Sequence, residues 1–580
     1  MTYEYRKHTL SDIPRFGAAE HPSRPALSMV GGEAITYSRL EACVEACAQG
    51  LAALGIGKGD RVAVLSESRP EWGIASFGIA RAGAVAVPIL VDFPVEQIAN
   101  ILAHSEARAV IASARLRKKL EGVDLEAAII PIEELSSPRA APEGRQAVLP
   151  VAAPGDLAAI VYTSGTTGRS KGVMLTHSNY IADALACSSI IVLDPEDVLL
   201  SILPLAHAYE YTIGFLIPMM SGASVQYLEK PPIASVLLPA LASIRPSIVL
   251  SVPLVIEKIY RSAVKPSLEK VGLYRVPFMK PLLCRVAGRK LEKTFGGRLR
   301  FFGVGGAPLD PEVETFLLRA RFPYAIGYGL TETAPIIAAA AVGRTRLRMA
   351  GPPLGGADIR IVDEAGRPTG RGAGEIQVSG PMVGPGYYKD PERSAEAFTK
   401  DGYFRTGDLG CFDRRGRLFV RGRLKTVILG ASGENIYPEE VEAVLNSSPF
   451  VAESLVYGDD EGLTALIQLK PEIMDELMEY MREGLQGAEK AAARFGHSVG
   501  QTIRNAAEHT AKAAGHAAEQ AGQAEQAVER AAKELLARIK KETNERLAVF
   551  SRIGKVERQE EPFEKTPTQK IKRFLYPRKR

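Results

Sequence analysis

The sequence has few cysteines and no metal-binding arrangement of them. Only five of its 580 residues are cysteines, and they form no CxxC pair and no Cys/His cluster. We therefore interpret them as reduced thiols and expect a cytosolic protein without a disulfide framework. Apolar residues make up 46% of the chain, which is ample for a globular core.

Long hydrophobic runs are also missing. The first residues, MTYEYRKHTLSDIPRFG, lack the apolar region of a signal peptide. The most hydrophobic stretch lies near residues 212 to 228, and it is interrupted by Pro218, Ser221, Ser224 and Gln226. We expect no membrane-spanning segment and no secretion signal, and hence a cytoplasmic location.

The net charge is small, +5, but the basic residues are unevenly spread. Residues 275 to 300 combine apolar side chains with a single acidic residue, Glu292, and eight basic ones. The basic residues are Arg275, Lys280, Arg285, Arg289, Lys290, Lys293, Arg298 and Arg300. This mixture suits a peripheral contact with the anionic inner face of a membrane, and equally a solvated helix with a basic outer face. The basic tail IKRFLYPRKR lacks an aromatic-rich binding module, so we expect no nucleic-acid partner.

The chain has 580 residues, which are too many for a single hydrophobic core, so two or three domains are expected. From about residue 25 to 420, short apolar strands such as RVAVLS alternate with helical segments such as PVEQIANILAHS, which predicts an α/β fold with buried strands. Gly- and Pro-rich turns predict a β-rich subdomain between 351 and 422. We therefore predict a large N-terminal domain of several subdomains, residues 1–422, and a small α+β C-terminal domain, residues 423–580.

An Ala-, Gln- and Glu-rich segment from about 484 to 550 repeats with a period of eleven residues. Eleven residues span three helical turns, so the apolar stripe stays nearly straight along a helix. Counting in steps of eleven gives three rows of residues along the helix. The first row is Phe495, Ala506, Ala517, Val528, Ile539 and Phe550. The second is Val499, Thr510, Ala521, Ala532 and Thr543, and the third is Ile503, Ala514, Glu525, Leu536 and Leu547. The pattern predicts an extended helix or helical hairpin inserted in the C-terminal domain. Its stripe would dock on protein or lipid, and a solvated spacer is the alternative.

The segment YTSGTTGRSKG, residues 162 to 172, is suited to phosphate. Its glycines let the backbone approach a ligand closely, while its hydroxyls and Lys171 surround the ligand with donors. The apolar runs LAAIVY and VML flank it, so we expect the turn to be held between rigid elements. Its spacing differs from the GxxxxGK[ST] of a Walker A loop. Taken alone, the segment is compatible with a phosphate-binding loop and with an ordinary turn.

Five further segments form an ordered pattern with this loop. They are GVGGAPL at 303–309, GYGLTETAP at 327–335, DGYFRTGDLG at 401–410, GRLKTVILGASGENIYPEEVE at 422–442 and TPTQKIKR at 566–573. Together they resemble the adenylate-forming acyl-CoA synthetases, a family of AMP-forming ligases. The resemblance extends over residues 25 to 470 and 566 to 573, and the segment from 484 to 550 falls outside it.

The resemblance implies a triphosphate site. The loop residues implied to wrap the phosphates of ATP are Thr163, Ser164, Gly165, Thr166, Thr167, Gly168 and Lys171. Ser170 departs from the proline common in the family, which removes a rigid residue but no ligand group. Thr331 is implied to contact a nucleotide phosphate and Glu332 to hold Mg²⁺, whereas a glutamate outside this motif would more often be a solvated charge.

The resemblance also implies a nucleoside site. Three small residues would admit the flat adenine base, although they also suit a tight strand-to-helix turn. These residues are Gly305, Gly306 and Ala307. Tyr328 would flank the adenine. Asp408 would accept two hydrogen bonds from the ribose hydroxyls, and Arg423 would be a second ribose contact.

The C-terminal domain is implied to be mobile. Lys425 occupies the hinge position of the family, although the neighbouring Thr426 is commonly acidic in relatives. Lys570, in TPTQKIKR, is implied to be the catalytic lysine of adenylate formation. The domain would then swing about Lys425, withdraw Lys570 and present GASGEN, residues 430 to 435, to the thiol.

The implied activity is the activation of a fatty acid by ATP to an acyl-adenylate and its transfer to CoA, with ATP, Mg²⁺ and CoA required. The segments LPLAHAYEYTIGF, residues 203–215, and VPLVIEKIY, residues 252–260, most resemble the long-chain branch. His207 and Tyr209, with Tyr211, would line the acyl entrance, although His207 equally suits a packed wall. Transfer to the phosphopantetheine of a carrier protein and a non-catalytic scaffold are the alternatives.

Overall fold

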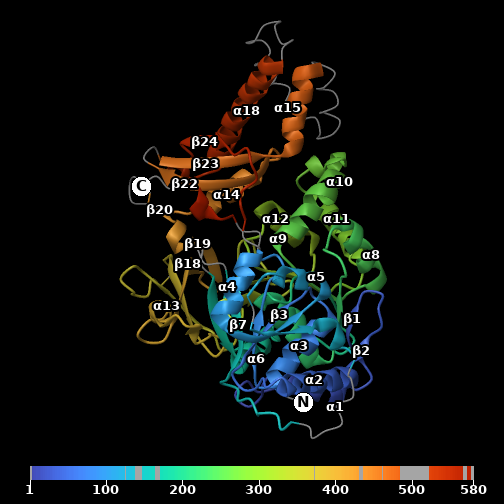
Figure 1. Ribbon diagram of the computed structural model, residues 1–580. Coiled ribbons are helices and arrows are strands. Elements are labelled where there is room, and N and C mark those ends of the chain that lie inside the picture. The colour runs from blue at the N-terminus through green and yellow to red at the C-terminus, as the bar shows by residue number, and fades with distance from the viewer. Residues whose placement is uncertain are drawn as a thin grey trace. The chain divides into compact units, whose positions relative to one another are not determined.

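The chain divides into two compact units (Figure 1). Unit 1 comprises Met1–Thr406 and Gly410–Val420, and unit 2 comprises Gly407–Leu409 and Arg421–Arg580. The computed structural model describes residues 3–124, 126–137, 147–163, 170–370, 372–429, 435–459, 462–483, 521–565 and 571–576. Among the helices of these ranges, none has the length and apolar character needed to cross a membrane.

The first sheet of unit 1 carries the predicted phosphate loop. Its seven strands follow the order β17-β8-β7-β4-β3-β5-β6. They are β3 (Arg61–Leu65), β4 (Val85–Pro88), β5 (Ala107–Ala112), β6 (Ala128–Pro131), β7 (Leu157–Thr163), β8 (Lys171–Thr176) and β17 (Gly386–Tyr387). The central strands are parallel, and helices α3 (Pro70–Arg81) and α4 (Val95–Ser105) connect them. Every side chain of β4 is buried, as expected for a strand covered on both faces.

The second sheet has eight strands in the order β14-β13-β12-β11-β9-β10-β1-β2. They are β1 (Pro25–Met29), β2 (Ile35–Thr36), β9 (Val198–Ser201), β10 (Ser224–Tyr227), β11 (Ile248–Ser251), β12 (Phe301–Val304), β13 (Tyr324–Gly329) and β14 (Ile336–Ala340). All neighbours are parallel except the edge strands β2 and β14. The helices between them include α6 (His177–Cys187), α8 (Ala234–Ile244), α9 (Pro253–Ile259), α10 (Lys265–Glu269), α11 (Lys280–Thr294) and α12 (Pro311–Ala320). The predicted α/β class is confirmed.

A third sheet supplies the β-rich part predicted between 351 and 422. Its four strands are β15 (Asp358–Val362), β16 (Gly374–Ser379), β18 (Phe404–Phe412) and β19 (Leu418–Arg423). β15 pairs antiparallel with β16 along the whole of β15. The prediction of short strands here is confirmed.

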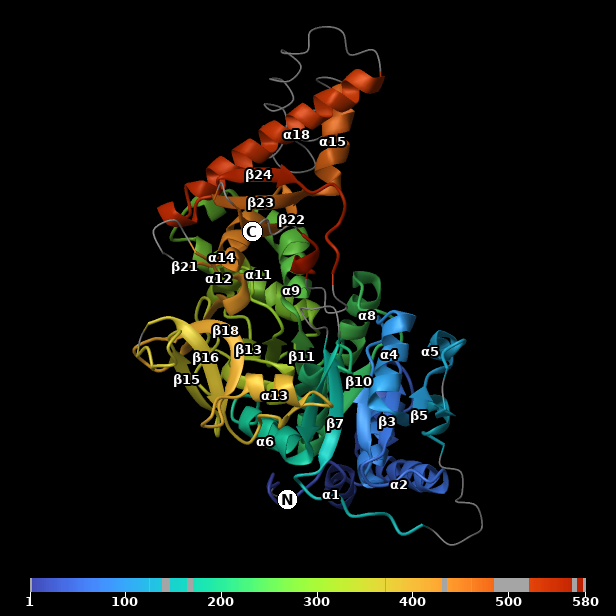
Figure 2. The ribbon, with the colours of Figure 1, turned by 60° about the vertical axis from the view of Figure 1, so that its left-hand side comes forward.

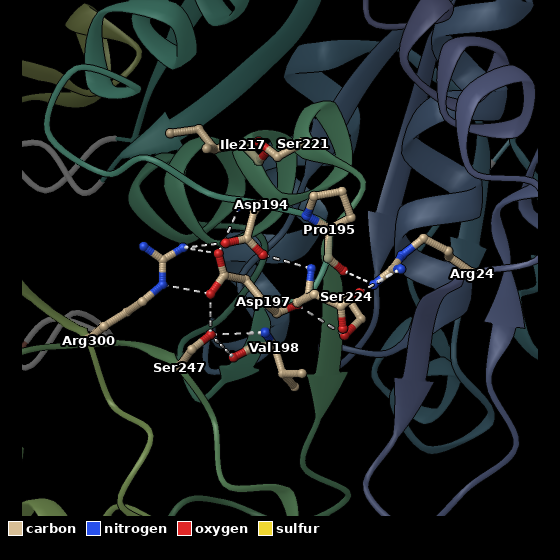
Figure 3. Close-up of polar contacts among 11 residues, drawn as sticks. Arg24, Asp194, Pro195, Asp197, Val198, Ile217, Ser221, Ser224, Ser247 and Arg300 are labelled. Carbon is tan, nitrogen blue, oxygen red and sulfur yellow. Dashed lines mark hydrogen bonds and ion pairs between the residues drawn. The ribbon is translucent and has the colours of Figure 1, made fainter.

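An ionic cluster ties together the amino-terminal ends of the second sheet (Figure 3). Asp197, directly before β9, accepts hydrogen bonds from Ser247 Oγ and Arg300 Nε, both at 2.7 Å, which precede β11 and β12. Ser247 Oγ also accepts a bond from the Val198 amide at 3.0 Å. The opposite edge, at the carboxyl ends of the same strands, carries the predicted nucleotide segments, as is usual for open α/β sheets.

Unit 2 is smaller and mixes helices with a short sheet. β22 (Val451–Asp459) pairs antiparallel with β23 (Gly462–Leu469), which pairs in parallel with β24 (Lys555–Arg558). The helices are α14 (Pro438–Asn446), α15 (Pro471–Glu483) and α18 (Ala521–Asn544), and a two-stranded ladder joins β20 (Ile428–Leu429) to β21 (Asn435–Ile436). This arrangement confirms the α+β organisation predicted for the C-terminal part.

The eleven-residue pattern appears as the buried face of α18. The residues of this stripe that are buried in the structure are Val528, Ala532, Leu536, Ile539 and Thr543. The four apolar residues among them pack with Ile473 and Leu477 of α15, which lies alongside (Figure 2), and with the three-stranded sheet. The helix is confirmed over 521–544, while 484–520 lie outside the described residues. For this part, the surface on which the stripe docks is the core of unit 2 itself, so α18 is a structural component of that unit and not a spacer.

Candidate active site

The predicted phosphate loop connects two paired strands. β7 ends at Thr163 and β8 begins at Lys171, and these residues face each other in the antiparallel pair. Residues 164–169 lie outside the described residues, and with them Ser164, Gly165, Thr166, Thr167 and Gly168. The expectation that rigid elements hold this turn is confirmed at both of its ends.

Both ends of the loop offer polar groups. The Thr163 hydroxyl is buried and has no hydrogen-bond partner among the described residues. A buried hydroxyl left without a partner costs about 1–3 kcal/mol, so a phosphate oxygen placed here would relieve that cost. At the other end, Ser170 Oγ accepts a hydrogen bond from Gln97 Nε2 of α4 at 2.7 Å. This bond anchors the position at which the family commonly has proline.

Lys171, Glu332 and Tyr387 form a compact polar cluster. Lys171 Nζ lies 2.6 Å from Glu332 Oε1 and donates to the Tyr387 hydroxyl at 3.0 Å. The Tyr387 hydroxyl in turn donates to Glu332 Oε1 at 2.9 Å. Tyr387 comes from β17, which pairs with β8 and so runs beside Lys171. Three segments that are distant in the sequence therefore meet at the end of the phosphate loop.

Glu332 remains ionised although it is buried. Burial alone would raise the pKa of this carboxyl. The charge and hydrogen bond of Lys171 oppose this effect of burial, and so does the hydrogen bond from Tyr387. The pKa of Glu332 therefore lies below its ordinary value. The site therefore holds a fixed negative charge beside a fixed positive one, close to the predicted triphosphate.

Backbone contacts position Thr331 and Glu332 after β13. A side chain at Gly329 would meet the Pro335 carbonyl oxygen at 1.8 Å, so only glycine fits where the chain turns back. The Thr333 hydroxyl bridges Leu330 and Pro335, and the Glu332 carbonyl accepts the Gly384 amide at 2.8 Å. Thr331 is half-buried beside Glu332, and its predicted contact with a nucleotide phosphate stays a prediction.

The predicted adenine segment follows β12 at the same edge of the sheet. Gly306 has a φ of +87°, which favours glycine, and Ala307 follows it. A Cβ added at Gly305 would lie 3.1 Å from the ring of Tyr209. Tyr209, predicted at the acyl entrance, therefore packs against the adenine segment. Tyr328 lies half-buried near the end of β13.

The two other residues predicted at the acyl entrance differ in burial. His207 is half-buried at the start of the turn that leads into the π-helical segment Glu210–Leu216. Tyr211 is buried, and its hydroxyl shares a hydrogen bond of 2.7 Å with Ser76 Oγ. It borders a small cavity of about 20 Å³ lined mainly by alanines, Trp72 and Tyr180.

The predicted ribose contacts pair with each other. Asp408 of β18 is buried, and its Oδ1 lies 2.8 Å from Nε of Arg423, which ends β19. Lys425 follows two residues later and is exposed, in the 3₁₀ turn Leu424–Thr426. Thr426, which replaces an acidic residue of relatives, donates to Glu439 Oε1 at 2.8 Å. All of these residues belong to unit 2.

Lys570 lies outside the described residues, whereas residues 571–576 lie within them. Arg573 forms an ion pair with the buried Glu442 of α14 and lies 3.8 Å from Glu439. Both glutamates come from the YPEEVE part of the predicted motif. The terminal motif is thus fastened to α14 three residues beyond Lys570.

The donor set suits a magnesium ion bound together with a nucleotide. The described residues contain no group of three or more His, Cys, Asp or Glu that could hold a metal unaided. Glu332 supplies one ionised carboxylate oxygen donor. Mg²⁺ usually takes one or two carboxylates and completes its octahedron with phosphates and waters. The residues present therefore fit this ion.

Sequence reasoning missed Tyr387. It lies in GPGYYKD, a Gly-rich stretch that reads as an ordinary loop. Its role in the cluster arises from the pairing of β17 with β8, which are more than 200 residues apart in the sequence. No local sequence pattern predicts such a pairing.

Comparison with known proteins assigns the family. Residues 15–388 match the family described as AMP-binding enzyme. The peroxisomal long chain acyl-CoA synthetase 7 of Arabidopsis thaliana is 32% identical over 491 residues, which cover 76% of this chain and 69% of that protein. The long-chain-fatty-acid–CoA ligase FadD15 of Mycobacterium tuberculosis is 31% identical over 475 residues, covering 74% of this chain and 76% of the relative.

A solved structure agrees over nearly the whole chain. The ATP-bound RpMatB-BxBclM chimera B1 superposes with a TM-score of 0.75 and 25% identity, covering 98% of both chains. O-succinylbenzoate coenzyme A synthetase of Bacillus subtilis, in complex with ATP and magnesium, shares the fold with a TM-score of 0.72 and 24% identity. With its motifs in the family's order and the family match covering more than half of its length, the chain belongs to the AMP-binding enzyme family.

Proposed function

We propose that the protein is an AMP-forming fatty acid–CoA ligase that prefers long-chain acids. The observation that carries the proposal is the Lys171–Glu332–Tyr387 cluster, an ionised carboxylate and an ammonium group fixed at the end of a glycine- and hydroxyl-rich loop. The relatives named as long-chain acyl-CoA synthetases support the substrate class.

The reaction proceeds in two steps. A carboxylate oxygen of the fatty acid attacks the α-phosphorus of ATP, and pyrophosphate leaves, so that the acid becomes an acyl-adenylate. The thiol sulfur of CoA then attacks the acyl carbon, loses its proton, and expels AMP. Activation is needed because a carboxylate has no adequate leaving group, whereas AMP is one.

The first step concentrates negative charge on phosphate oxygens. The loop, Thr331 and Lys171 would donate to these oxygens, and a well-placed donor of this kind stabilises a transition state by about 3–4 kcal/mol. Glu332 would hold Mg²⁺, which would neutralise phosphate charge. Lys171 lies 2.6 Å from Glu332, so this donor is adjacent to the residue that would hold Mg²⁺.

The nucleoside would lie between two short segments. Adenine would contact Tyr328 and the small residues of the segment after β12, which are Gly305, Gly306 and Ala307. Arg423 Nε lies 2.8 Å from Asp408 Oδ1, and this contact would orient the carboxylate toward the ribose hydroxyls. His207 and Tyr209 would border the acyl group.

The C-terminal part, residues 423–580, would act as a mobile lid. Lys570 would approach the α-phosphate during adenylate formation, and rotation about Lys425 would then exchange it for residues 430–435 at the thiol site. Lys570→Ala should abolish adenylate formation while transfer to CoA from a preformed acyl-adenylate persists. Equal loss of both half-reactions would contradict this role.

A panel of carboxylic acids scored for pyrophosphate release, with and without CoA, tests the proposed function. We expect release that depends on long-chain acids and a thioester that forms with free CoA. A thioester that forms only with a phosphopantetheine-loaded carrier protein would reassign the acceptor. Absence of acid-dependent release across the panel would overturn the ligase assignment.

A peripheral contact with the anionic inner face of the membrane completes the proposal. The basic and apolar residues between 275 and 300 support it. Long-chain acids partition into bilayers, so such a contact would bring the enzyme close to its substrate.

A further inference from the structure

α11 and the turn before it expose an unusual combination of side chains. The helix is anchored by an inner face of Cys284, Gly288 and Leu291. A Cβ at Gly288 would lie 2.7 Å from the Cβ of Ala320, so glycine lets α11 pack closely on α12. The opposite face is therefore not required to hold the helix in place.

Large apolar side chains protrude from that opposite face. Phe278 is 80% exposed, Leu282 52% and Val286 57%. Leu282 and Val286 are four residues apart and so are neighbours on the helix surface. Leu273, on the 3₁₀ turn Gly272–Arg275 that packs beside α11, is 54% exposed. Single exposed apolar residues are common, but such a row on one side of a helix marks an interaction site.

Basic side chains surround this apolar row. Arg285, Arg289, Lys290 and Lys293 are exposed, and none of them forms an ion pair within the part of the chain that the structure describes. Residues 253 to 300 contain twelve basic and three acidic residues, whereas the whole chain has a net charge of +5. The remainder of the chain therefore carries a net negative charge, and this segment supplies the excess of positive charge.

We propose that this surface, formed by Phe278, Leu282, Arg285, Val286, Arg289, Lys290 and Lys293, docks on an anionic lipid bilayer. The apolar row enters the boundary between headgroups and acyl chains, and the basic residues contact the lipid phosphates. α11 is about 22 Å long, so it lies in the plane of the interface and does not cross it. We name this surface the lipid-facing surface.

Its chemistry favours a bilayer over other anionic partners. A nucleic acid would gain from the basic residues but offers no apolar layer to cover Phe278 and Leu282. An acidic protein surface would need hydrophobic pockets matched to this row. A fluid bilayer satisfies both groups at once, since it presents phosphates above acyl chains without shape matching.

Vesicle sedimentation of the full-length protein tests the proposal. The vesicles are phosphatidylcholine alone and phosphatidylcholine mixed with phosphatidylglycerol, each at low and high salt. We expect binding to the mixed vesicles only, weakened by salt. Arg289→Gln/Lys290→Gln/Lys293→Gln should weaken binding by roughly 100-fold, because each basic residue near an anionic surface contributes about a factor of five. Phe278→Gln/Leu282→Gln should weaken it by roughly tenfold or more.

Matched controls separate local from general effects. Arg117→Gln/Lys118→Gln/Arg414→Gln removes the same charge from exposed positions outside the lipid-facing surface and should change binding by less than about twofold. If both triple variants lose binding equally, net charge and not this surface is responsible, and the proposal falls. If Phe278→Gln/Leu282→Gln binds like the wild type, a purely ionic contact replaces the proposed docking.

A fluorescent reporter gives a second readout that does not depend on loss of binding. The sole tryptophan, Trp72, is 2% exposed and should not respond to lipid. Phe278→Trp should shift its emission to the blue on mixed vesicles, whereas Val192→Trp, at a position that is 70% exposed, should not. An unchanged spectrum at position 278 would contradict insertion. The surface deepens the membrane contact of the proposed function but does not depend on the ligase reaction, so vesicle binding without fatty acid activation would leave the surface standing and refute only the proposed ligase activity.

Discussion

Two buried glutamates of unit 1 have opposite charge states, and the comparison shows what burial alone does. Glu332 lies next to Lys171 and Tyr387, and its pKa is lowered. Glu210, in the π-helical segment, is fully buried and accepts a hydrogen bond from Ser201 Oγ at 2.5 Å. Its second oxygen has no partner among the described residues. Burial therefore dominates there and raises the pKa of Glu210 to about 8.

The difference lies in the neighbouring cation and not in the depth of burial. An ionised carboxylate in a protein interior needs a partner that replaces its lost hydration, and Lys171 provides one at 2.6 Å. Among the described residues, Glu210 has only the Ser201 hydroxyl as a partner, and it remains protonated near neutral pH. A buried charge that is maintained by a dedicated partner is what a phosphate and metal site requires, whereas a protonated glutamate contributes to packing and hydrogen bonding.

The largest expected effect removes the charge of Glu332. Glu332→Gln keeps the shape but loses the ionised oxygen, so we expect adenylate formation to fall by about 100- to 1000-fold, or roughly 3–4 kcal/mol. Acid-dependent pyrophosphate release measures this loss. Glu364→Gln, at an exposed turn, removes an equal charge and should have full activity. A Glu332→Gln enzyme as active as this control would remove Glu332 from the site.

The next effect concerns stability and acts through Glu210. The unfolded chain has an ordinary glutamate pKa of 4.5, and the folded pKa is about 8. Between these values the folded state binds the additional proton, so stability is greatest below the unfolded pKa and decreases as pH rises through the folded pKa. From pH 6 to pH 8 the wild type should lose roughly 2 kcal/mol more than Glu210→Gln, which stays neutral.

Urea unfolding of both proteins at the two pH values measures this difference. Parallel changes in the two proteins would show that Glu210 is already ionised at pH 6, and the contrast with Glu332 would then disappear.

Tyr387 sharpens the comparison because its hydroxyl donates a hydrogen bond to Glu332, which is only one of the two glutamates. Tyr387→Phe removes a hydrogen bond to the ionised carboxylate but leaves Lys171 in place. We expect a loss of about 1.5 kcal/mol, or roughly tenfold in pyrophosphate release, since hydrogen bonds to charged groups contribute about this much. Tyr388→Phe, at the adjacent position, is the matched control and should have nearly full activity. A loss as large as that of Glu332→Gln would mean that Lys171 alone does not keep Glu332 ionised.

The same contrast explains how much was predictable from the sequence. The alternation of strands and helices has a local period, and the phosphate loop, Glu332 and Asp408 lie in compact motifs, so all could be found by reading along the chain. Tyr387 could not, because its place depends on which strand pairs with β8. The charge state of Glu210 could not either, since among the described residues it depends on burial and on the Ser201 hydroxyl, which only the three-dimensional structure brings together. The eleven-residue stripe predicted a helix, but not that α18 would pack on α15 and the sheet of its own unit.

The smallest expected effect concerns the hydrogen bond between Gln97 and Ser170, at the end of the phosphate loop where the family commonly has proline. Ser170 Oγ accepts a hydrogen bond from Gln97 Nε2 at 2.7 Å, and this bond substitutes for the rigidity of a proline ring. Ser170→Ala and Gln97→Ala should each raise the KM for ATP by about three- to fivefold, because a neutral hydrogen bond contributes about 1 kcal/mol. The double variant should be no worse than either single one, since both remove the same bond. Ser170→Pro should have the KM for ATP of the wild type, because a proline fixes the backbone without the hydrogen bond from Gln97. Additive losses in the double variant would show that Ser170 and Gln97 act separately, and the loop would then owe its position to the strand pairing of Thr163 with Lys171 alone.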